Sequence, residues 1–223
     1  MRDAAPLLSL LGHELRAPAG VVGGYLSLLE QGRDQLTPDQ QKAVAGARRA
    51  QQSMVEALDD LRRLTIAWRA DGEPISWVAL PQLVQDVRHV AATRSVPLAV
   101  HNTATVAVPR RGRDSVLADA LVAVAEAVAR EHGADVVADI AVEDGALLWR
   151  LRPVGTDTAA APTAYPFDQW RAGMGVRLVA AVVAIASSFG TLTDLRLGDA
   201  RYGVDVRFDL NADGAFTAPD RPR

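Results

Sequence analysis

The sequence PLLSLLGHELRAPAGVVGGYLSLLEQ, residues 6–31, decides how the chain begins to fold. Apolar residues recur in it at spacings of one, three, four and seven positions: Leu7, Leu8, Leu11, Leu15, Val22, Leu26 and Leu29. This spacing predicts an amphipathic helix, because side chains three and four positions apart share one helical face. Gly32 follows directly and ends the predicted helix.

A second helix is predicted from about residue 38 to residue 69. Thr37 is a favourable N-cap, and Pro38 suits the first helical position. The core positions of a coiled coil are matched by Ala47, Gln51, Met54, Leu58, Leu61, Thr65 and Trp68. Two long helices joined by a short turn predict an antiparallel hairpin, with a seam through Met54, Leu58 and Leu61 left uncovered. We therefore expect a homodimer in which two hairpins, residues 1–70 of each chain, form a four-helix bundle.

The pattern changes after a linker-like cluster at residues 71–74. Residues 77–210 predict a second unit in which helices alternate with pairs of short strands, so the fold class is α+β with helices on one face of a mixed sheet. The helices are expected at about 80–93, 113–131 and 174–188. The strands are expected at 96–102, at 104–109, on both arms of a hairpin in 134–153 that turns at Asp144-Gly145, and at 191–197 and 202–210. The segment 157–172 is predicted to be irregular, and the tail 211–223 to be disordered.

Composition excludes several classes of protein. Of the 223 residues, 49% are hydrophobic and 23% are charged, which is the balance of a soluble globular protein. The absence of cysteine excludes a disulfide framework, a thiolate metal site and a cysteine nucleophile, and it fits the cytoplasm. A formal charge of -3 gives no basic field for nucleic acid, and the longest apolar run is too short to cross a membrane. Neither nucleic acid nor a membrane is an expected partner.

The segment Gly12-His13-Glu14-Leu15-Arg16-Ala17-Pro18 carries the candidate chemistry. A neutral imidazole nitrogen is a competent nucleophile at physiological pH, and a neighbouring carboxylate can take or orient the other ring proton. His13 and Glu14 are therefore the candidate catalytic residues. The other three histidines stand in no such motif, and we interpret them as ordinary structural or surface residues: His89, His101 and His132.

This segment resembles the H box of two-component histidine kinases, whose usual form is Ser-His-Glu-Leu-Arg-Thr-Pro. The resemblance continues through Gly24-Tyr25 and Leu28-Leu29 and covers about residues 5–70. It implies that His13 accepts a phosphoryl group on the outer face of a dimeric bundle and that the partner is the receiver domain of a response regulator. Ala17 departs from the family, which commonly has Thr or Asn there for dephosphorylating the regulator.

The second unit resembles the ATP-binding (Bergerat) domain of the same family in the order of its elements. Its motifs depart from the family: Glu126 stands at the position of the magnesium-binding Asn, and Ala129 at that of a phosphate-binding Lys. Pro153 replaces the adenine-binding Asp, although Gly155 is kept. Without the resemblance, the helix that carries Glu126 is explained as an amphipathic helix that packs its valines.

Glycines at the start of the last helix complete the nucleotide motifs. Gly173 and Gly175 resemble the Gly-x-Gly that surrounds phosphates at a helix N-terminus, and a helix-entry turn explains them equally well. The resemblance therefore implies a degenerate ATP site made of Glu126, Gly155, Gly173 and Gly175, with no dedicated metal site. No cofactor is expected unless the chain binds Mg-ATP.

The preferred interpretation is a phosphotransferase that exchanges a phosphoryl group between His13 and a receiver aspartate, like histidine phosphotransferases built on kinase-like dimers. Two alternatives stay open. One is an active histidine kinase with divergent nucleotide motifs, and the other is a noncatalytic dimeric scaffold that sequesters regulators. The intact His13-Glu14 pair favours chemistry over a scaffold, whereas Glu126, Ala129 and Pro153 favour a relay over an autonomous kinase.

Overall fold

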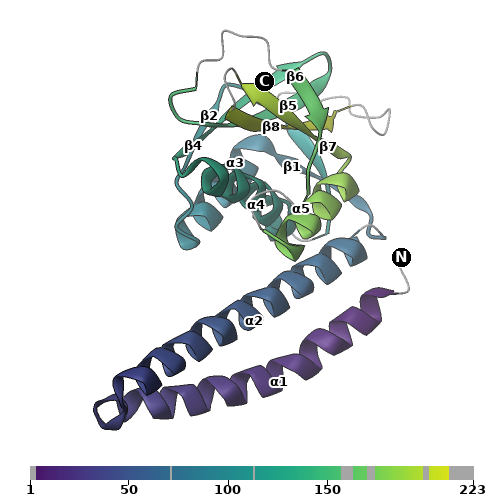
Figure 1. Ribbon diagram of the computed structural model, residues 1–223. Coiled ribbons are helices and arrows are strands. Elements are labelled where there is room, and N and C mark those ends of the chain that lie inside the picture. Colours follow the sequence, from purple (N-terminus) through teal and green to yellow (C-terminus); the bar gives the residue numbers. More distant parts are fainter. Residues whose placement is uncertain are drawn as a thin grey trace.

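The two helices of the predicted hairpin are present and pack side by side. The structure, a computed structural model, describes residues 4–70, 72–112, 114–156, 163–169, 174–197 and 201–210. Helix α1 (Ala4–Gln31) and helix α2 (Pro38–Ala70) are joined by the single 3₁₀ turn η1 (Arg33–Gln35). They form the elongated arm at the bottom of Figure 1. Both helix bounds lie within two residues of those predicted.

The start of α2 is fixed by a reciprocal cap. The backbone N–H of Gln40 donates to the hydroxyl oxygen of Thr37 at 3.3 Å, and the backbone N–H of Thr37 donates to the side-chain amide oxygen of Gln40 at 2.8 Å. Such a capping box satisfies two backbone donors at once, one in the first helical turn and one at the N-cap itself. The prediction of Thr37 as the N-cap is therefore confirmed.

Three further helices and eight strands make up the second unit in the described residues. The helices are α3 (Leu80–Thr93), α4 (Asp114–His132) and α5 (Val176–Ser187). The strands are β1 (Ile75–Ala79), β2 (Leu98–Asn102), β3 (Ala107–Arg111), β4 (Val136–Glu143), β5 (Ala146–Pro153), β6 (Thr163–Pro166), β7 (Gly190–Leu197) and β8 (Arg201–Asp209).

Most of the strands form one mixed sheet, as predicted. Its order among the described residues is β2-β4-β5-β8-β7-β6, with β2 and β4 parallel and every other neighbouring pair antiparallel. Strands β1 and β3 pair separately, with Val78 opposite Val108. The sequence did not predict β1, and β3 begins three residues later than expected.

Strand β6 corrects a second expectation. The segment 157–172 was predicted to be irregular, yet Thr163–Pro166 pairs antiparallel with β7 at the edge of the sheet. All four of its residues are exposed, which is why the segment carries no alternation of buried and exposed positions. Gly173, the turn at Gly198-Asp199 and the tail 211–223 lie outside the described residues.

Helices α3, α4 and α5 cover one face of the large sheet, and the core lies between them (Figure 1). Trp149 and Phe208 are its largest fully buried side chains. Helix α5 is largely apolar and packs on two sides, against the sheet on one side and against α2 on the other. Helix α2 therefore lies between α1 and the second unit, and it is the element through which the hairpin contacts the sheet domain.

Candidate functional site

His13 is exposed on α1 and lines a cavity of about 590 Å³ between α1 and α2. Three arginines line the same cavity, namely Arg16, Arg62 and Arg69, together with one carboxylate, Glu73. An excess of positive charge around an accessible imidazole favours the approach of a phosphoryl group.

Glu14 is exposed as well, but it is not among the residues that line this cavity. No hydrogen bond joins Glu14 to His13 within the described part of the chain. The helix continues through Pro18, which has no N–H to donate to the carbonyl of Glu14. The carbonyl of Glu14, directly beside His13, therefore lacks its usual hydrogen bond within the helix.

One ion pair anchors the His13 segment to α2. The guanidinium of Arg16 donates to Asp59 at 2.5 Å, and both side chains are about half exposed. Arg16 lies three residues after His13, so it shares a helical face with the histidine. The contact joins α1 to α2 close to His13.

Glu126 lies in a different environment, with its side chain only 12% exposed. One guanidinium nitrogen of Arg177 contacts both of its carboxylate oxygens, at 3.0 and 3.1 Å, and Arg130 contacts one of them at 2.6 Å. Both oxygens are therefore already occupied by cations of the same chain. A magnesium ion would have to displace these arginines before Glu126 could bind it.

Arg177 also connects the second unit to the hairpin. Its Nε donates to the carboxylate of Asp60 on α2 at 2.9 Å, and the same oxygen of Asp60 accepts from Arg63 at 2.6 Å. Burial alone would lower the pKa of Arg177, but the hydrogen bonds and charges of Asp60 and Glu126 outweigh burial and leave this pKa raised. Asp60, Arg177 and Glu126 thus form an ionic bridge between α2, α5 and α4, which we call the interdomain bridge.

The two described glycines of the predicted nucleotide site occupy turns. Gly155 has φ +78° in the turn after β5, and Gly175 has φ +56° as the N-cap residue of α5. Both conformations favour glycine whether or not a nucleotide binds. The cavity that Glu126 lines takes in Arg94, Ala129 and Arg130 but neither of these glycines.

The residues at this position do not fit a magnesium nucleotide. Glu126 is held by two arginines, Ala129 offers no cation, and Pro153 is a buried strand residue opposite Val136. Nowhere in the described residues do three or more His, Asp or Glu side chains come together in a group able to hold a metal. Within the same residues, no helix has both the length and the hydropathy that a bilayer span requires.

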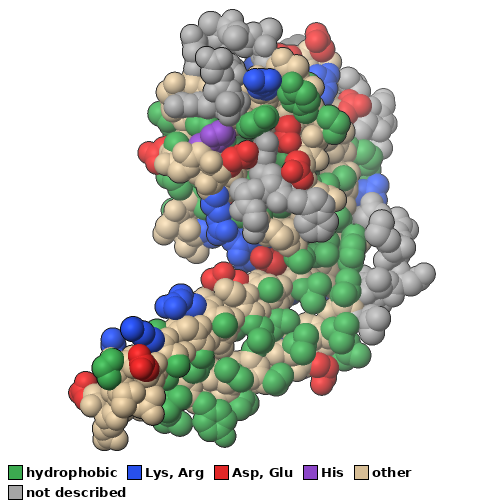
Figure 2. All heavy atoms as spheres, viewed as in Figure 1, with side chains coloured by type: hydrophobic (Ala, Val, Ile, Leu, Met, Phe, Trp, Pro, Cys, Tyr) green, Lys and Arg blue, Asp and Glu red, His purple; other side chains and the backbone are tan. Residues whose placement is uncertain are grey.

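The apolar residues left uncovered gather on the hairpin, where Figure 2 shows them over its outer surface. The exposed large ones on α1 and α2 are Leu10, Leu11, Leu15, Val21, Val22, Tyr25, Leu28, Leu29, Met54 and Ile66. The predicted seam is partly wrong: Met54 is 51% exposed, but Leu58 is only 6% exposed and packs inside one hairpin. The uncovered face belongs mainly to α1, because α5 and α4 pack against the opposite side of α2.

Sequence reasoning missed Asp60 and Arg177, which are 117 residues apart. A signal for them existed, because a glutamate between buried valines of α4 requires a cationic partner. Nothing in the local pattern says which arginine supplies it. The structure therefore brings Glu126 together with α2 and the start of α5, and it leaves His13 in a separate cavity.

Comparison with known proteins identifies the fold. No family model matches the sequence, and no curated protein matches it. Among solved structures, the histidine kinase AdeS of Acinetobacter baumannii has a TM-score of 0.52 at 17% identity, with 89% of this chain and 98% of AdeS covered. Full-length ShkA in complex with AMPPNP has a TM-score of 0.57 at 19% identity, with 91% of this chain but only 44% of ShkA covered. The chain has the fold of histidine kinases, with the helical hairpin followed by the α/β domain.

Proposed function

We propose that this chain is a two-component phosphotransfer protein that exchanges a phosphoryl group between His13 and the aspartate of a response-regulator receiver domain. The observation that carries the proposal is the exposed imidazole of His13 in a cavity lined by Arg16, Arg62 and Arg69. A receiver domain brings its own acyl phosphate, so the chain needs only an accessible nucleophile and cations around it.

The transfer step uses groups of this chain. The lone pair of one imidazole nitrogen of His13 forms the new bond to phosphorus, and the bond from phosphorus to the aspartate oxygen breaks. The aspartate leaves as a carboxylate. Glu14 takes or orients the proton on the other ring nitrogen, and the arginines balance the charge of the phosphoryl oxygens. The reverse step returns the group to a receiver.

Self-phosphorylation from ATP is not part of the proposal. Replacing the magnesium ligand, the phosphate lysine and the adenine-binding aspartate removes about 4 to 5 kcal/mol at roughly 1.5 kcal/mol each, which turns a micromolar site into a millimolar one. The occupied carboxylate of Glu126 supports this reasoning. Ala17 offers no hydroxyl or amide to orient a water, so we expect no phosphatase activity either.

A homodimer completes the proposal. Two copies of the exposed apolar face of α1, which includes Tyr25 and Leu28, would bury each other in a four-helix bundle. The basic cavity around His13 would then be present twice in each dimer.

The test is transfer from labelled receiver domains encoded in the same genome. Full-length chain incubated with a phosphorylated receiver is expected to become labelled, and His13→Gln is expected to stay unlabelled while keeping its mass in solution. His89→Gln is the matched control, since His89 is also an exposed helical histidine. Labelling of His13→Gln equal to the unmodified chain would overturn the site.

A parallel incubation with radiolabelled Mg-ATP separates the alternatives. Label on His13 from ATP would make the chain a histidine kinase with divergent nucleotide motifs. Binding of a receiver without any transfer would make it a scaffold.

A further inference from the structure

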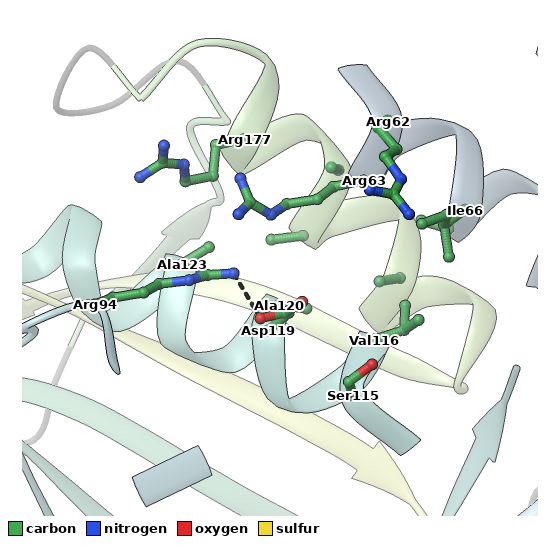
Figure 3. Close-up of a pocket in the computed structure, with 14 residues that line it drawn as sticks. Arg62, Arg63, Ile66, Arg94, Ser115, Val116, Asp119, Ala120, Ala123 and Arg177 are labelled. Carbon is green, nitrogen blue, oxygen red and sulfur yellow. Dashed lines mark hydrogen bonds and ion pairs between the residues drawn. The ribbon is translucent and has the colours of Figure 1, made fainter. Parts of the chain in front are cut away.

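A second cavity, of about 200 Å³, lies where the hairpin meets the α/β domain (Figure 3). Four arginines line it, and they come from three separate places: Arg62 and Arg63 from α2, Arg94 from the end of α3, and Arg177 from α5. One carboxylate, Asp119 of α4, lines it with them. The remaining wall is made mostly of alanines of α4 and α5.

The carboxylates that neutralise some of these arginines lie outside the cavity wall. Arg63 and Arg177 share Asp60, and Arg177 also holds Glu126, but neither acid lines the cavity. Arg62 is exposed on α2 and is not part of the interdomain bridge. The wall therefore presents more positive than negative charge to whatever enters.

Arg94 has a buried nitrogen that lacks a hydrogen-bond partner among the described residues. Its Nη2 donates to Asp119 at 2.5 Å, but its Nη1 is buried without a hydrogen-bond partner among the described residues. Burial lowers the pKa of Arg94, and the like charges of Arg63 and Arg177 act in the same direction against the opposing effect of Asp119. A guanidinium stays charged at neutral pH, so burial and like charges destabilise the folded chain at Arg94. A bound anion would offset this destabilisation.

We propose that this cavity binds a small organic anion, whose phosphate or carboxylate group lies among Arg62, Arg63 and Arg94 and whose apolar end lies on the alanine wall. The volume is below the roughly 300 to 1,000 Å³ of pockets for drug-sized ligands, so the occupant is smaller than a nucleoside triphosphate. Ser115, at one end of the cavity in Figure 3, adds a hydroxyl donor.

An anion bound at this site would connect the hairpin to the α/β domain. It contacts α2 on one side and α4 and α5 on the other, so a bound anion adds to the interdomain bridge. Arg62 and Ile66 line both this cavity and the one around His13. Binding would therefore be transmitted to the phosphoryl acceptor through side chains of a single helical turn.

The test is calorimetry of the full chain with phenyl phosphate, inorganic phosphate and benzoate at constant ionic strength. We expect one saturable site per chain, with phenyl phosphate bound more tightly than inorganic phosphate because of the alanine wall. Comparison of phenyl phosphate with benzoate shows which anionic group the arginines prefer. Arg62→Gln and Arg94→Gln are each expected to weaken binding about tenfold or more.

Two controls make the result decisive. Arg49→Gln, an exposed arginine elsewhere on α2, and His13→Gln are expected to bind like the unmodified chain. Loss of binding in His13→Gln would place the anion in the other cavity and overturn the proposal, as would no saturable binding of any probe up to about 10 mM. If Arg94→Gln does not fold, the exposed Arg62 decides: unchanged affinity in Arg62→Gln refutes the site. None of these outcomes depends on phosphoryl transfer by His13.

Discussion

The hairpin and the α/β domain present their candidate residues in opposite ways. His13 is exposed in an open cavity, with arginines nearby that a phosphoryl group can reach. The side chain of Glu126 is only 12% exposed at the contact between domains, and both of its oxygens are held by arginines. Both positions came from resemblance to one family. Of two residues predicted from the same resemblance, one is therefore exposed to solvent, whereas the carboxylate of the other is already paired within the chain.

The two regions also differ in how they treat apolar surface. The α/β domain buries most of its large apolar side chains between helices and sheet, with Trp149, Leu151 and Phe208 fully covered. Helix α1 buries only Ala19 and Leu26 among the residues whose side chains are described, and it leaves a row of large apolar residues uncovered. The first region is complete as one chain, whereas the second has an apolar face suited to a second copy.

The largest effect is expected for Leu58→Asp, which tests whether Leu58 packs inside one hairpin. Leu58 belongs to the interior of the hairpin, so a carboxylate there is expected to cost about 4 kcal/mol or more and to unfold the arm. Urea unfolding followed by circular dichroism measures the loss. Leu58→Met, which conserves volume, is the control and is expected to cost less than about 1.5 kcal/mol. A folded Leu58→Asp that merely becomes monomeric would restore the seam first predicted from the sequence.

Arg177→Ala tests the interdomain bridge. It leaves Asp60 and Glu126 without their shared cation in a mostly buried place, and we expect a loss of about 3 kcal/mol in the free energy of unfolding. The double variant Arg177→Met with Glu126→Gln is expected to recover part of this loss, because no buried charge is left unpaired at α4. Equal stability of Arg177→Ala and the unmodified chain would contradict the bridge.

Leu28→Asp tests the apolar face of α1. Leu28 is 63% exposed in a single chain, so the substitution is expected to leave the fold intact and to weaken the proposed dimer at least tenfold. Light scattering at micromolar concentration measures the mass. Val154→Asp is the matched control, because Val154 is 53% exposed but lies in the α/β domain, and its mass is expected not to change. A monomeric unmodified chain would rule out the dimer.

Arg16→Ala is expected to have the smallest effect, about 0.5 kcal/mol in the free energy of unfolding. Arg16 and Asp59 are both about half exposed, and water replaces much of what such a pair provides. Urea unfolding beside Arg177→Ala gives the comparison directly. A loss as large as that of Arg177→Ala would show that the hairpin depends on charge as much as the domain contact does.

Local sequence patterns predicted most helices and strands of the fold. They failed for two short strands, one of which lies at the edge of the large sheet. Heptad spacing and the Thr37 cap predicted α1 and α2, and Asp144-Gly145 predicted the β4–β5 turn. Strand β1 has Trp77, Val78 and Ala79 in succession, and β6 has four residues, all exposed and ending in Pro166, so neither carries an alternating pattern. Both are strands because a partner strand pairs with them, which the local sequence does not encode.

In the candidate site, too, the sequence predicted the residues of a local motif but not the contacts between distant residues. His13 was found because its motif is contiguous, whereas the partners of Glu126 come from α5 and from its own helix, and Asp60 joins them from α2. The lining of the small arginine cavity is equally dispersed along the chain. Contacts between residues this far apart depend on how the domains dock, and no spacing rule gives that.

Asp59 and Asp60 are neighbours in sequence, yet one holds Arg16 of α1 and the other holds Arg177 of α5. Successive residues of a helix point about 100° apart, and this angle sets the phase between the two docking surfaces of α2. Inserting one residue between the two aspartates would turn one surface away from its partner, whereas inserting seven would nearly restore the phase. An insertion that changes this phase would therefore change the angle between the histidine helix and the α/β domain, since both pack on α2.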